Sequence, residues 1–422
     1  MKRQNLRSLT LRVLQIPYSF WVFIGFFITY LYFFIQPIFL REHVMQFFTY
    51  LPAIDPIGED LRQILSYSKE FVAFHSPYIG KNLYPPLTSI LFSPLLLFDF
   101  SFAYRIITLF SIFCYFFCTW IFPIIINKST KNYALLALIG VTGALSYGFQ
   151  FELERGQFNI IAVFFALLAI LVFFRFPKLK FLAYLFFSLA VQLKLYPFIF
   201  IFLLIKDWKA WKDNLKIVIT LSLINFALFF IMGTNVFVQF VKAIISQSIN
   251  PQSWIGNHSI RSYFLFINNV SPEIAANEIY NHSTFLQIAF MSLAIACLII
   301  IIIFVAKRNQ NKFSKELFFT STLVALLIPS ISHDYTLSIL AAPFATYFMD
   351  IDAFSAGKKK SVTLVLIIIV FSILYSSTLY SYTNKFLFFG NNFFALMLSL
   401  LILVFITVVK TRWIEDPIQN AQ

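Results

Sequence analysis

Lys194 lies in the middle of the apolar stretch Phe181–Ile205, within the tetrad Lys194-Leu195-Tyr196-Pro197. A lysine at membrane depth costs at least about 2.5 kcal/mol, and a proline removes a backbone hydrogen bond that lipid cannot replace. A cation at a broken membrane helix therefore predicts a functional site. The alternative is a lysine whose ammonium snorkels to the membrane surface.

Three carboxylates stand at the start of a predicted helix in the segment 41–101. They are Asp55, Glu59 and Asp60, and the apolar residues after Asp60 fall on one face of a helix over Leu61–Phe74. Such an amphipathic helix is expected to lie on the membrane surface. Asp60 stands where an aspartate caps a helix, so helix capping and catalysis are both open for it.

Two further motifs place polar side chains at predicted helix starts. Tyr84-Pro85-Pro86-Leu87 predicts an extended segment that leads into a short helix over Leu87–Phe98. Gly156-Gln157-Phe158-Asn159 opens a later helix. Gln157 and Asn159 could hydrogen-bond a ligand there, or they could cap the helix.

Two more titratable groups accompany these motifs. Arg155 could contact a substrate or form an ion pair with Glu152 or Glu154. His333 and Asp334 stand at the start of an apolar run, where they could act in a site or cap a helix. Both alternatives stay open for each group.

The composition places these residues in an integral membrane protein. Of 422 residues, 60% are hydrophobic and 12% are charged, against roughly 25% charged in a soluble domain. The mean hydropathy is +0.81. We expect one polytopic, all-helical membrane domain over residues 1–422. The first apolar run, Pro17–Leu40, exceeds the length of a signal-peptide core and is expected to remain as the first span.

About twelve membrane segments are predicted, with both termini cytoplasmic. The segments are 17–40, 102–126, 133–150, 157–174, a bent pair 181–193 and 196–205, 216–233, 284–306, 317–332, 335–350, 362–381 and 393–410. This map puts most of the 32 lysines and arginines on the cytoplasmic side. A single crossing by Phe181–Ile205 would put Lys358-Lys359-Lys360 outside, so the charge rule favours the bent pair. Lys194 then lies near the outer leaflet, at the tip of a broken hairpin.

Two long loops, 41–101 and 234–281, are predicted on the outer side. All five histidines map to this side, including His258, which lies close to Arg261 in Asn257-His258-Ser259-Ile260-Arg261. Because titratable groups concentrate there, we expect function to face outward. The net charge of +14 is explained by cytoplasmic topology signals, so no nucleic-acid partner is expected. The three cysteines lie in apolar runs and predict neither a disulfide nor a metal site.

Five motifs in this order resemble the family 87 glycosyltransferases of the GT-C superfold. The motifs are Asp60-Leu61, Tyr84-Pro85-Pro86-Leu87, Gly156-Gln157-Phe158-Asn159, Lys194-Leu195-Tyr196-Pro197 and His333-Asp334-Tyr335. The fold implied is a GT-C-type helical bundle similar to that of the polyprenyl-phosphate-mannose-dependent mannosyltransferases. Eukaryotic lipid-linked-oligosaccharide glucosyltransferases share similar patterns, so the motifs do not fix the sugar.

The resemblance implies transfer of a sugar, with mannose expected, from a polyprenyl-phosphate donor to a glycolipid or glycan acceptor. The reaction would invert the sugar at the outer face of the cell (plasma or inner) membrane, among membrane lipids. In such families the base comes from the first outer loop, which implies Asp60, with Asp55 and Glu59 as rivals.

A lipid phosphate can leave without a metal or cofactor if cations hold its charge. The cations implied for this role are Lys194, Arg155, Arg261 and His333. The remaining substrate-binding residues implied are Tyr84, Gln157, Asn159 and His258.

Other functions stay open. A transporter or flippase of lipid-linked sugars also uses intramembrane charge and broken helices, although no second half repeats the Lys-Leu-Tyr-Pro break. A polymerase or ligase for surface glycans would act on the same kind of lipid-linked sugar, and the motifs give it no support. Sugar transfer from polyprenyl-phosphate donors would separate these functions.

Overall fold

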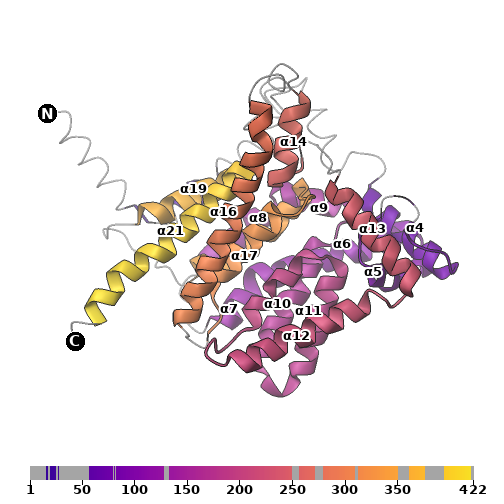
Figure 1. The fold of residues 1–422 in the computed structure, drawn as a ribbon, viewed down its shortest axis with the longest axis horizontal. Coiled ribbons are helices and arrows are strands. Elements are labelled where there is room, and N and C mark those ends of the chain that lie inside the picture. The colour runs from indigo at the N-terminus through magenta and orange to yellow at the C-terminus, as the bar shows by residue number, and fades with distance from the viewer. Residues whose placement is uncertain are drawn as a thin grey trace.

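The described part of the chain, in a computed structural model, is all-helical (Figure 1). The described residues are 16–17, 20–24, 27, 57–78, 80, 82–127, 133–249, 256–270, 279–308, 312–349, 361–375 and 394–419. Two segments in these ranges are long and apolar enough to cross a membrane, Phe100–Ile126 and Ser283–Arg308. A bent pair, Tyr133–Ala144 with Gly148–Arg155, would make a third, and shorter apolar helices accompany them. The expected all-helical membrane architecture is confirmed, while the number of spans and their orientation stay predictions.

The helices of the first half carry the segments predicted to hold the site. Their bounds are α4 (Glu59–Val72), α5 (Pro86–Phe92), η1 (Ser93–Leu97), α6 (Phe100–Phe116), η2 (Phe117–Ile121), α7 (Phe122–Ile126), α8 (Tyr133–Ala144), α9 (Tyr147–Arg155), α10 (Asn159–Arg175), η3 (Pro177–Leu179), α11 (Lys180–Leu193) and η4 (Tyr196–Leu204). The first predicted span, 17–40, and Asp55 lie wholly or mostly outside the described residues.

The second half is built in the same way. Its described helices are α12 (Trp211–Leu228), α13 (Thr234–Ile249), α14 (Ile260–Val270), α16 (Ile279–Arg308), α17 (Lys315–Leu327), η5 (Asp334–Leu340), α18 (Ala341–Phe348), α19 (Val362–Tyr375) and α21 (Phe394–Gln419). An isolated antiparallel bridge joins Asn257 to His333.

The helices α6, η2 and α7 form one continuous span that matches the predicted segment 102–126. Asp99 caps its start, because its Oδ2 accepts the N–H of Phe102 at 3.3 Å. Pro123 cannot donate a helical hydrogen bond, and the turn before it, η2, loosens into a π-helical turn.

The helices α10 and α11 form a hairpin that explains how the Gln157 and Lys194 motifs meet. The short turn η3 joins them, so they run antiparallel and pack along their lengths. The end of α11 therefore lies beside the start of α10. Lys194 is extended (φ −147°, ψ 140°) and η4 follows with Pro197 in its first turn, which confirms the predicted break.

The structure of the predicted first outer loop differs from the sequence-based prediction in the start of one helix, its covering and the length of the next helix. The helix α4 begins at Glu59, and its N-cap is Gly58 in the left-handed conformation, so the prediction that Asp60 caps the helix was wrong. The apolar face of α4, with Leu61 and Ile64, is buried against α5, η1 and α9, so protein instead of lipid covers it. The predicted helix Leu87–Phe98 is split at Ser93 into α5 and η1.

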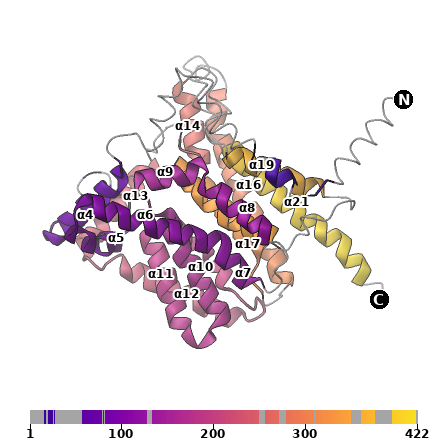
Figure 2. The same ribbon diagram turned by 180° about the vertical axis from the view of Figure 1, so that it is seen from behind.

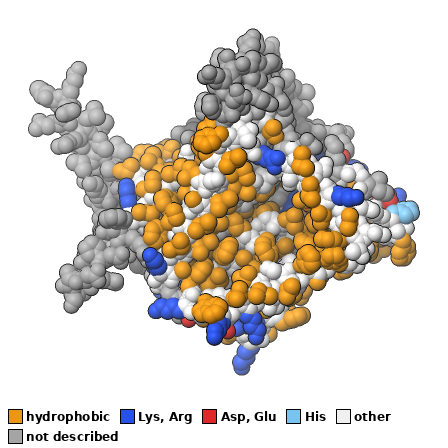
Figure 3. Space-filling view, in the orientation of Figure 1, with side chains coloured by type: hydrophobic (Ala, Val, Ile, Leu, Met, Phe, Trp, Pro, Cys, Tyr) orange, Lys and Arg blue, Asp and Glu red, His pale blue; other side chains and the backbone are white. Residues whose placement is uncertain are grey.

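The helices around the hairpin form successive layers. The helix α6 packs on α10, α10 on α11, and α11 on α12. The helices α12 and α16 lie toward the viewer in Figure 1, and α6 and α8 lie toward the viewer from the opposite side in Figure 2. Hydrophobic side chains cover the middle of the molecule, and Lys and Arg gather along one edge (Figure 3). The turn before α11 and the turn after η4 carry the exposed Lys178 and Lys206, in keeping with the predicted cytoplasmic side.

Candidate active site

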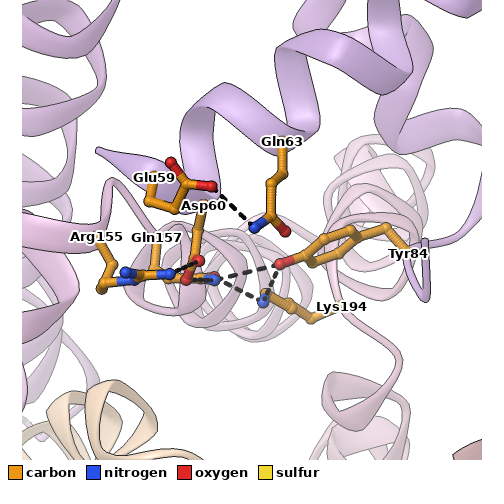
Figure 4. A network of polar contacts seen from close by, with 7 residues as sticks. All are labelled: Glu59, Asp60, Gln63, Tyr84, Arg155, Gln157 and Lys194. Atoms are coloured by element: carbon orange, nitrogen blue, oxygen red, sulfur yellow. Dashed lines mark hydrogen bonds and ion pairs between the residues drawn. The ribbon is translucent and has the colours of Figure 1, made fainter. Parts of the chain in front are cut away.

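Five side chains from four segments of the chain meet in one polar network (Figure 4). Arg155 Nη2 donates to Asp60 Oδ1 at 2.5 Å, and Gln157 Nε2 donates to Asp60 Oδ2 at 2.5 Å. Lys194 Nζ donates to Gln157 Oε1 at 2.9 Å. The Tyr84 hydroxyl accepts from Gln157 Nε2 at 3.2 Å and from Lys194 Nζ at 3.5 Å. The structure therefore brings together four of the five sequence motifs.

Two left-handed glycines set the approach of α4 to α9. Gly58 has φ +75° and Gly156 has φ +65°, and each directly precedes or follows a helix that carries a site residue. A Cβ at Gly156 would lie 2.8 Å from Leu61 Cβ. The N–H of Gly58 donates to the Glu154 carbonyl at 2.8 Å. The close approach that only glycine permits thus brings Asp60 to the Arg155 and Gln157 side chains.

Tyr84 enters the network as a neutral phenol. Its backbone N–H donates to Asn82 Oδ1 at 3.0 Å, which fixes the turn before α5. Burial, and next the charge of Asp60, raise the pKa of the Tyr84 hydroxyl above its ordinary value. Its oxygen accepts from Gln157 and Lys194, and the described residues take up no hydrogen bond from its own O–H. That O–H is available to a ligand.

Lys194 is held inward by aromatic rings. Its Nζ lies 4.5 Å from the ring centroid of Tyr84, 4.6 Å from that of Phe158 and 6.0 Å from that of Tyr335. These contacts, with the hydrogen bond to Gln157, direct the ammonium into the site, which is not the geometry of a snorkelling lysine. Phe158 and Tyr335 were part of the sequence motifs, but sequence reasoning gave neither a role.

Glu152 was missed as a part of the site. It is fully buried, its Oε1 accepts the N–H of Ile160 at 2.8 Å, and its Oε2 accepts the hydroxyl of Ser338. It joins α9, the start of α10 and η5, and it is near enough to Lys194 for the two charges to interact. The predicted ion pair of Arg155 with Glu152 or Glu154 was wrong, because the partner of Arg155 is Asp60.

The network combines a carboxylate, an ammonium and an uncommitted phenol in a partly buried place, which suits proton transfer and the binding of an anion. A model of glycosyltransferase family 87 matches residues 82–330. The chain belongs to glycosyltransferase family 87. It is therefore a glycosyltransferase, as the motifs indicated. A search of curated proteins found no match.

The start of α10 tests the helix-capping roles considered for Gln157 and Asn159 of this family 87 glycosyltransferase. The helix α10 begins at Asn159 with Phe158 as its N-cap and no side-chain cap, so the capping role considered for Gln157 and Asn159 was wrong. The Asn159 amide is 1% exposed, and neither of its polar atoms has a hydrogen-bond partner among the described residues. Buried polar groups normally have hydrogen-bond partners, so this amide lacks the contacts that a purely structural role would give it.

Glu59, a rival of Asp60 for the base of the family 87 enzyme, points elsewhere (Figure 4). Its Oε1 accepts from Gln63 Nε2 at 3.2 Å, an exposed contact within α4. Asp55, the other rival, lies outside the described residues. Among the described candidates, Asp60 has the geometry of a positioned base.

The segment 234–281, the second of the predicted outer loops, is held beside the site by a contact of His258. His258 Nε2 lies 2.5 Å from Asp334 Oδ1, and both side chains are fully buried. The N–H of His258 donates to the Ser332 carbonyl at 2.7 Å. His333 occupies the N-cap position of η5, although its side chain makes no capping hydrogen bond, and Asp334 lies in the first turn. The contact between His258 and Asp334 fixes the start of η5, which carries Tyr335.

His333 and Arg261 lie close to this contact in the chain. Burial lowers the pKa of His333 to about 4, and the charges of Asp60 and Lys194 also act on its ring, so His333 adjoins the network as a neutral imidazole. Arg261 is partly buried in the first turn of α14. His333 is therefore close enough to interact with the charges of the network, whereas His258 contacts Asp334.

Tyr67 is a further residue that sequence reasoning did not single out. It follows Asp60 by seven positions on α4, about two helical turns, so both side chains lie on the same face. Burial, and next the charge of Asp60, raise the pKa of its hydroxyl. The helical spacing alone could have pointed to it.

Proposed function

We propose that this glycosyltransferase transfers a sugar from a polyprenyl-phosphate donor to the hydroxyl of a glycolipid or glycan acceptor, with inversion. The observation that carries the proposal is the Gln157 amide, which binds Asp60 with its Nε2 and Lys194 with its Oε1. One amide group thus holds the proposed base on its nitrogen and the proposed cation on its oxygen. An inverting displacement needs a base on the attacking side and charge stabilisation on the leaving side.

Asp60 is the proposed base. A carboxylate offers about four lone pairs on its two oxygens, and Arg155 and Gln157 each take one. The remaining lone pairs can accept the proton of the acceptor hydroxyl while its oxygen attacks the anomeric carbon. The hydrogen bonds from Arg155 and Gln157 orient the carboxylate.

Lys194 and Tyr84 are proposed to hold the departing phosphate. As the bond between the anomeric carbon and the phosphate oxygen breaks, its electron pair stays on the polyprenyl phosphate. The Lys194 ammonium has three N–H groups, of which Gln157 and Tyr84 take two. The third N–H and the Tyr84 O–H can donate to the phosphate, and the aromatic rings exclude water from the contact.

The remaining roles follow from position. Asn159, His333, His258 and Arg261 stay proposals for contact with the donor or acceptor, and Tyr67 lies where a sugar ring bound at Asp60 would extend along α4. Because cations of the protein neutralise the phosphate, no metal is needed in this mechanism, and a chelator should leave the rate unchanged. Mannose is the first sugar to test, on the resemblance of the motifs.

The site is proposed to face outward in a single polytopic domain with cytoplasmic termini, in the plasma or inner membrane. The basic turns near Lys178 and Lys206 favour this orientation. In a cysteine-free variant, Ser66→Cys should react with a membrane-impermeant thiol reagent in intact cells, whereas Lys206→Cys should not. The reverse pattern would refute the orientation.

The decisive experiment uses purified protein and a panel of synthetic polyprenyl-phosphate donors carrying mannose, glucose or arabinose. We expect transfer from one donor, with an inverted anomeric centre in the product by NMR. The transporter alternative makes a different prediction, namely no transfer from any donor and movement of the intact lipid-linked sugar across a proteoliposome membrane.

A further inference from the structure

The tip of the first outer loop exposes a large aromatic residue in an unfavourable backbone conformation. Phe74 is 99% exposed and has φ +60°, a left-handed backbone conformation that residues other than glycine rarely adopt. Val72, two positions earlier, is 55% exposed. A strained backbone that presents an apolar side chain outward indicates a surface that something apolar covers.

This loop tip is fastened to α13. The hydroxyl of Ser76 donates to Gln239 Oε1, and the rings of Tyr78 and Phe240 lie 5.8 Å apart. The loop that carries Asp60 and Tyr84 and the start of the second outer loop therefore share one surface.

The helix α13 folds back onto the end of a lipid-facing helix. The ring of Phe237 lies 4.0 Å from that of Phe230 and 5.9 Å from that of Phe226, just after and within α12. Phe226 and Leu223 on α12 are 54% and 62% exposed, as side chains that face lipid would be. These ring contacts place α13 beside the end of α12, where a helix with exposed apolar side chains would leave the lipid.

One face of α13 is apolar and open. Val238, Ile245 and Ile249 are each exposed, and their spacing of seven and four residues puts them on the same face. Lys242, also exposed, lies four residues after Val238 on that face. An exposed helix face that combines aliphatic side chains with lysine fits the boundary between acyl chains and anionic headgroups. Figure 3 shows hydrophobic side chains over the region of α12 and α13.

We propose that Val72, Phe74, Val238, Ile245 and Ile249 form an interfacial patch that inserts into the membrane leaflet opposite the basic turns. The exposed Lys69 of α4, and Lys242, which lies between Val238 and Ile245 on α13, bind anionic lipid headgroups. The patch holds the loop that carries Asp60 and Tyr84 at the lipid surface. It stands independently of the sugar-transfer chemistry, and only the naming of the leaflet as the outer one rests on the proposed function.

The test uses an environment-sensitive fluorophore on single cysteines in a variant in which Cys114, Cys118 and Cys297 are alanine. The patch is probed by Phe74→Cys and Ile245→Cys. Leu109→Cys, 68% exposed on the membrane-length α6 segment, is the lipid-facing control, and Ser66→Cys on the polar face of α4 is the water-facing control. The labelled proteins are placed in phosphatidylcholine–phosphatidylglycerol vesicles, with and without bromine on shallow acyl positions.

We expect emission at positions 74 and 245 to be blue-shifted from that at 66 and quenched by brominated lipid, as at 109. Removing phosphatidylglycerol, or combining Lys69→Gln with Lys242→Gln, should reduce the quenching at 74 and leave it unchanged at 109. Emission at 74 and 245 that matches position 66 would overturn the proposal. Blue-shifted emission without bromine quenching would also overturn it, because protein would then cover the patch. Because two positions are read separately, failure of one variant to fold leaves the other to decide.

Discussion

Replacing Asp60 by asparagine perturbs the proposed base and the polar network together, and both effects can be sized from the hydrogen bonds that Asp60 accepts. Both carboxylate oxygens accept hydrogen bonds, from Arg155 and from Gln157. An asparagine at this position must turn its NH2 group against one of these two donors. The lost charge-assisted contact is worth about 1.5–3 kcal/mol, and leaving a buried donor unpaired costs about 1–3 kcal/mol. We therefore expect Asp60→Asn to lower the thermal stability as well as turnover.

A second substitution separates the two effects. Gln157 cannot relieve the conflict by rotating its amide, because its Oε1 accepts from Lys194. When Asp60→Asn is combined with Gln157→Glu, the new carboxylate can accept from the introduced asparagine NH2, from Lys194 and from the Tyr84 O–H. The double variant keeps the net charge of the network, so it should recover most of the lost stability. It still has no carboxylate at position 60, so turnover should stay about a hundredfold to ten-thousandfold below the parent, the range for loss of a general base.

Three measurements on the purified variants decide this prediction. They are the apparent melting temperature in detergent, the rate of sugar transfer at saturating donor, and the same rate for Glu59→Gln as a matched control. Glu59 contacts only Gln63 among the network residues drawn in Figure 4, so its variant should resemble the parent. The base role of Asp60 is refuted if Asp60→Asn turns over at the parent rate, or if the double variant regains turnover together with stability.

Three further predictions concern the cation, the glycine contact and the buried histidine. Lys194→Met should lower turnover at limiting donor about tenfold to a hundredfold, the equivalent of about 1.5–3 kcal/mol, with partial recovery in Lys194→Arg; unchanged donor kinetics would exclude Lys194 from the site. Gly156→Ala should lower both stability and turnover, because its Cβ would meet Leu61, whereas Gly233→Ala has a similar positive φ in open space and should keep its turnover. Since burial lowers the pKa of His333 to about 4 from 6.5, the unfolded chain binds a proton that the native chain does not, so the melting temperature should fall between pH 6.5 and pH 4, and less so in His333→Gln.

Local chemistry made the break after α11 predictable from the sequence. Pro197 cannot continue a helix, and the short turn before α11 forces the α10–α11 hairpin, so the meeting of the Gln157 and Lys194 motifs follows from residues within one stretch of chain. The span over α6 was equally predictable from its apolar length. These elements depend on properties of the segments themselves.

The start of α4 shows where local reasoning failed. Aspartate is a common helix cap, but Gly58 packs closely against Phe100 and Tyr104, and the helix begins earlier than predicted, at Glu59. The cap is then a left-handed glycine, and Asp60 is released to face α9. No local pattern encodes that packing, because it depends on α6 and α9 arriving at the same place.

The partners of the charged residues were unpredictable for the same reason. Sequence proximity suggested Glu152 or Glu154 for Arg155, yet its partner is Asp60, 95 positions away. Likewise, His258 and Asp334 are 76 positions apart and share a fully buried contact. The motifs could name the residues of the site, whereas only the folded chain determines which of them touch.

Hydrogen bonds between protein side chains hold the polar network together. The Gln157 side chain binds both Asp60 and Lys194, so contacts within the protein hold the proposed base and the proposed cation in place. Preorganised groups of this kind lower the barrier without having to reorient during the reaction. The groups left uncommitted are one N–H of Lys194 and the O–H of Tyr84 at one end, and the free lone pairs of Asp60 at the other. The proposed donor phosphate and acceptor hydroxyl can therefore bind without breaking the contacts that align the site. A carrier, which must release its charged cargo, would not require a base and a cation held in a fixed alignment.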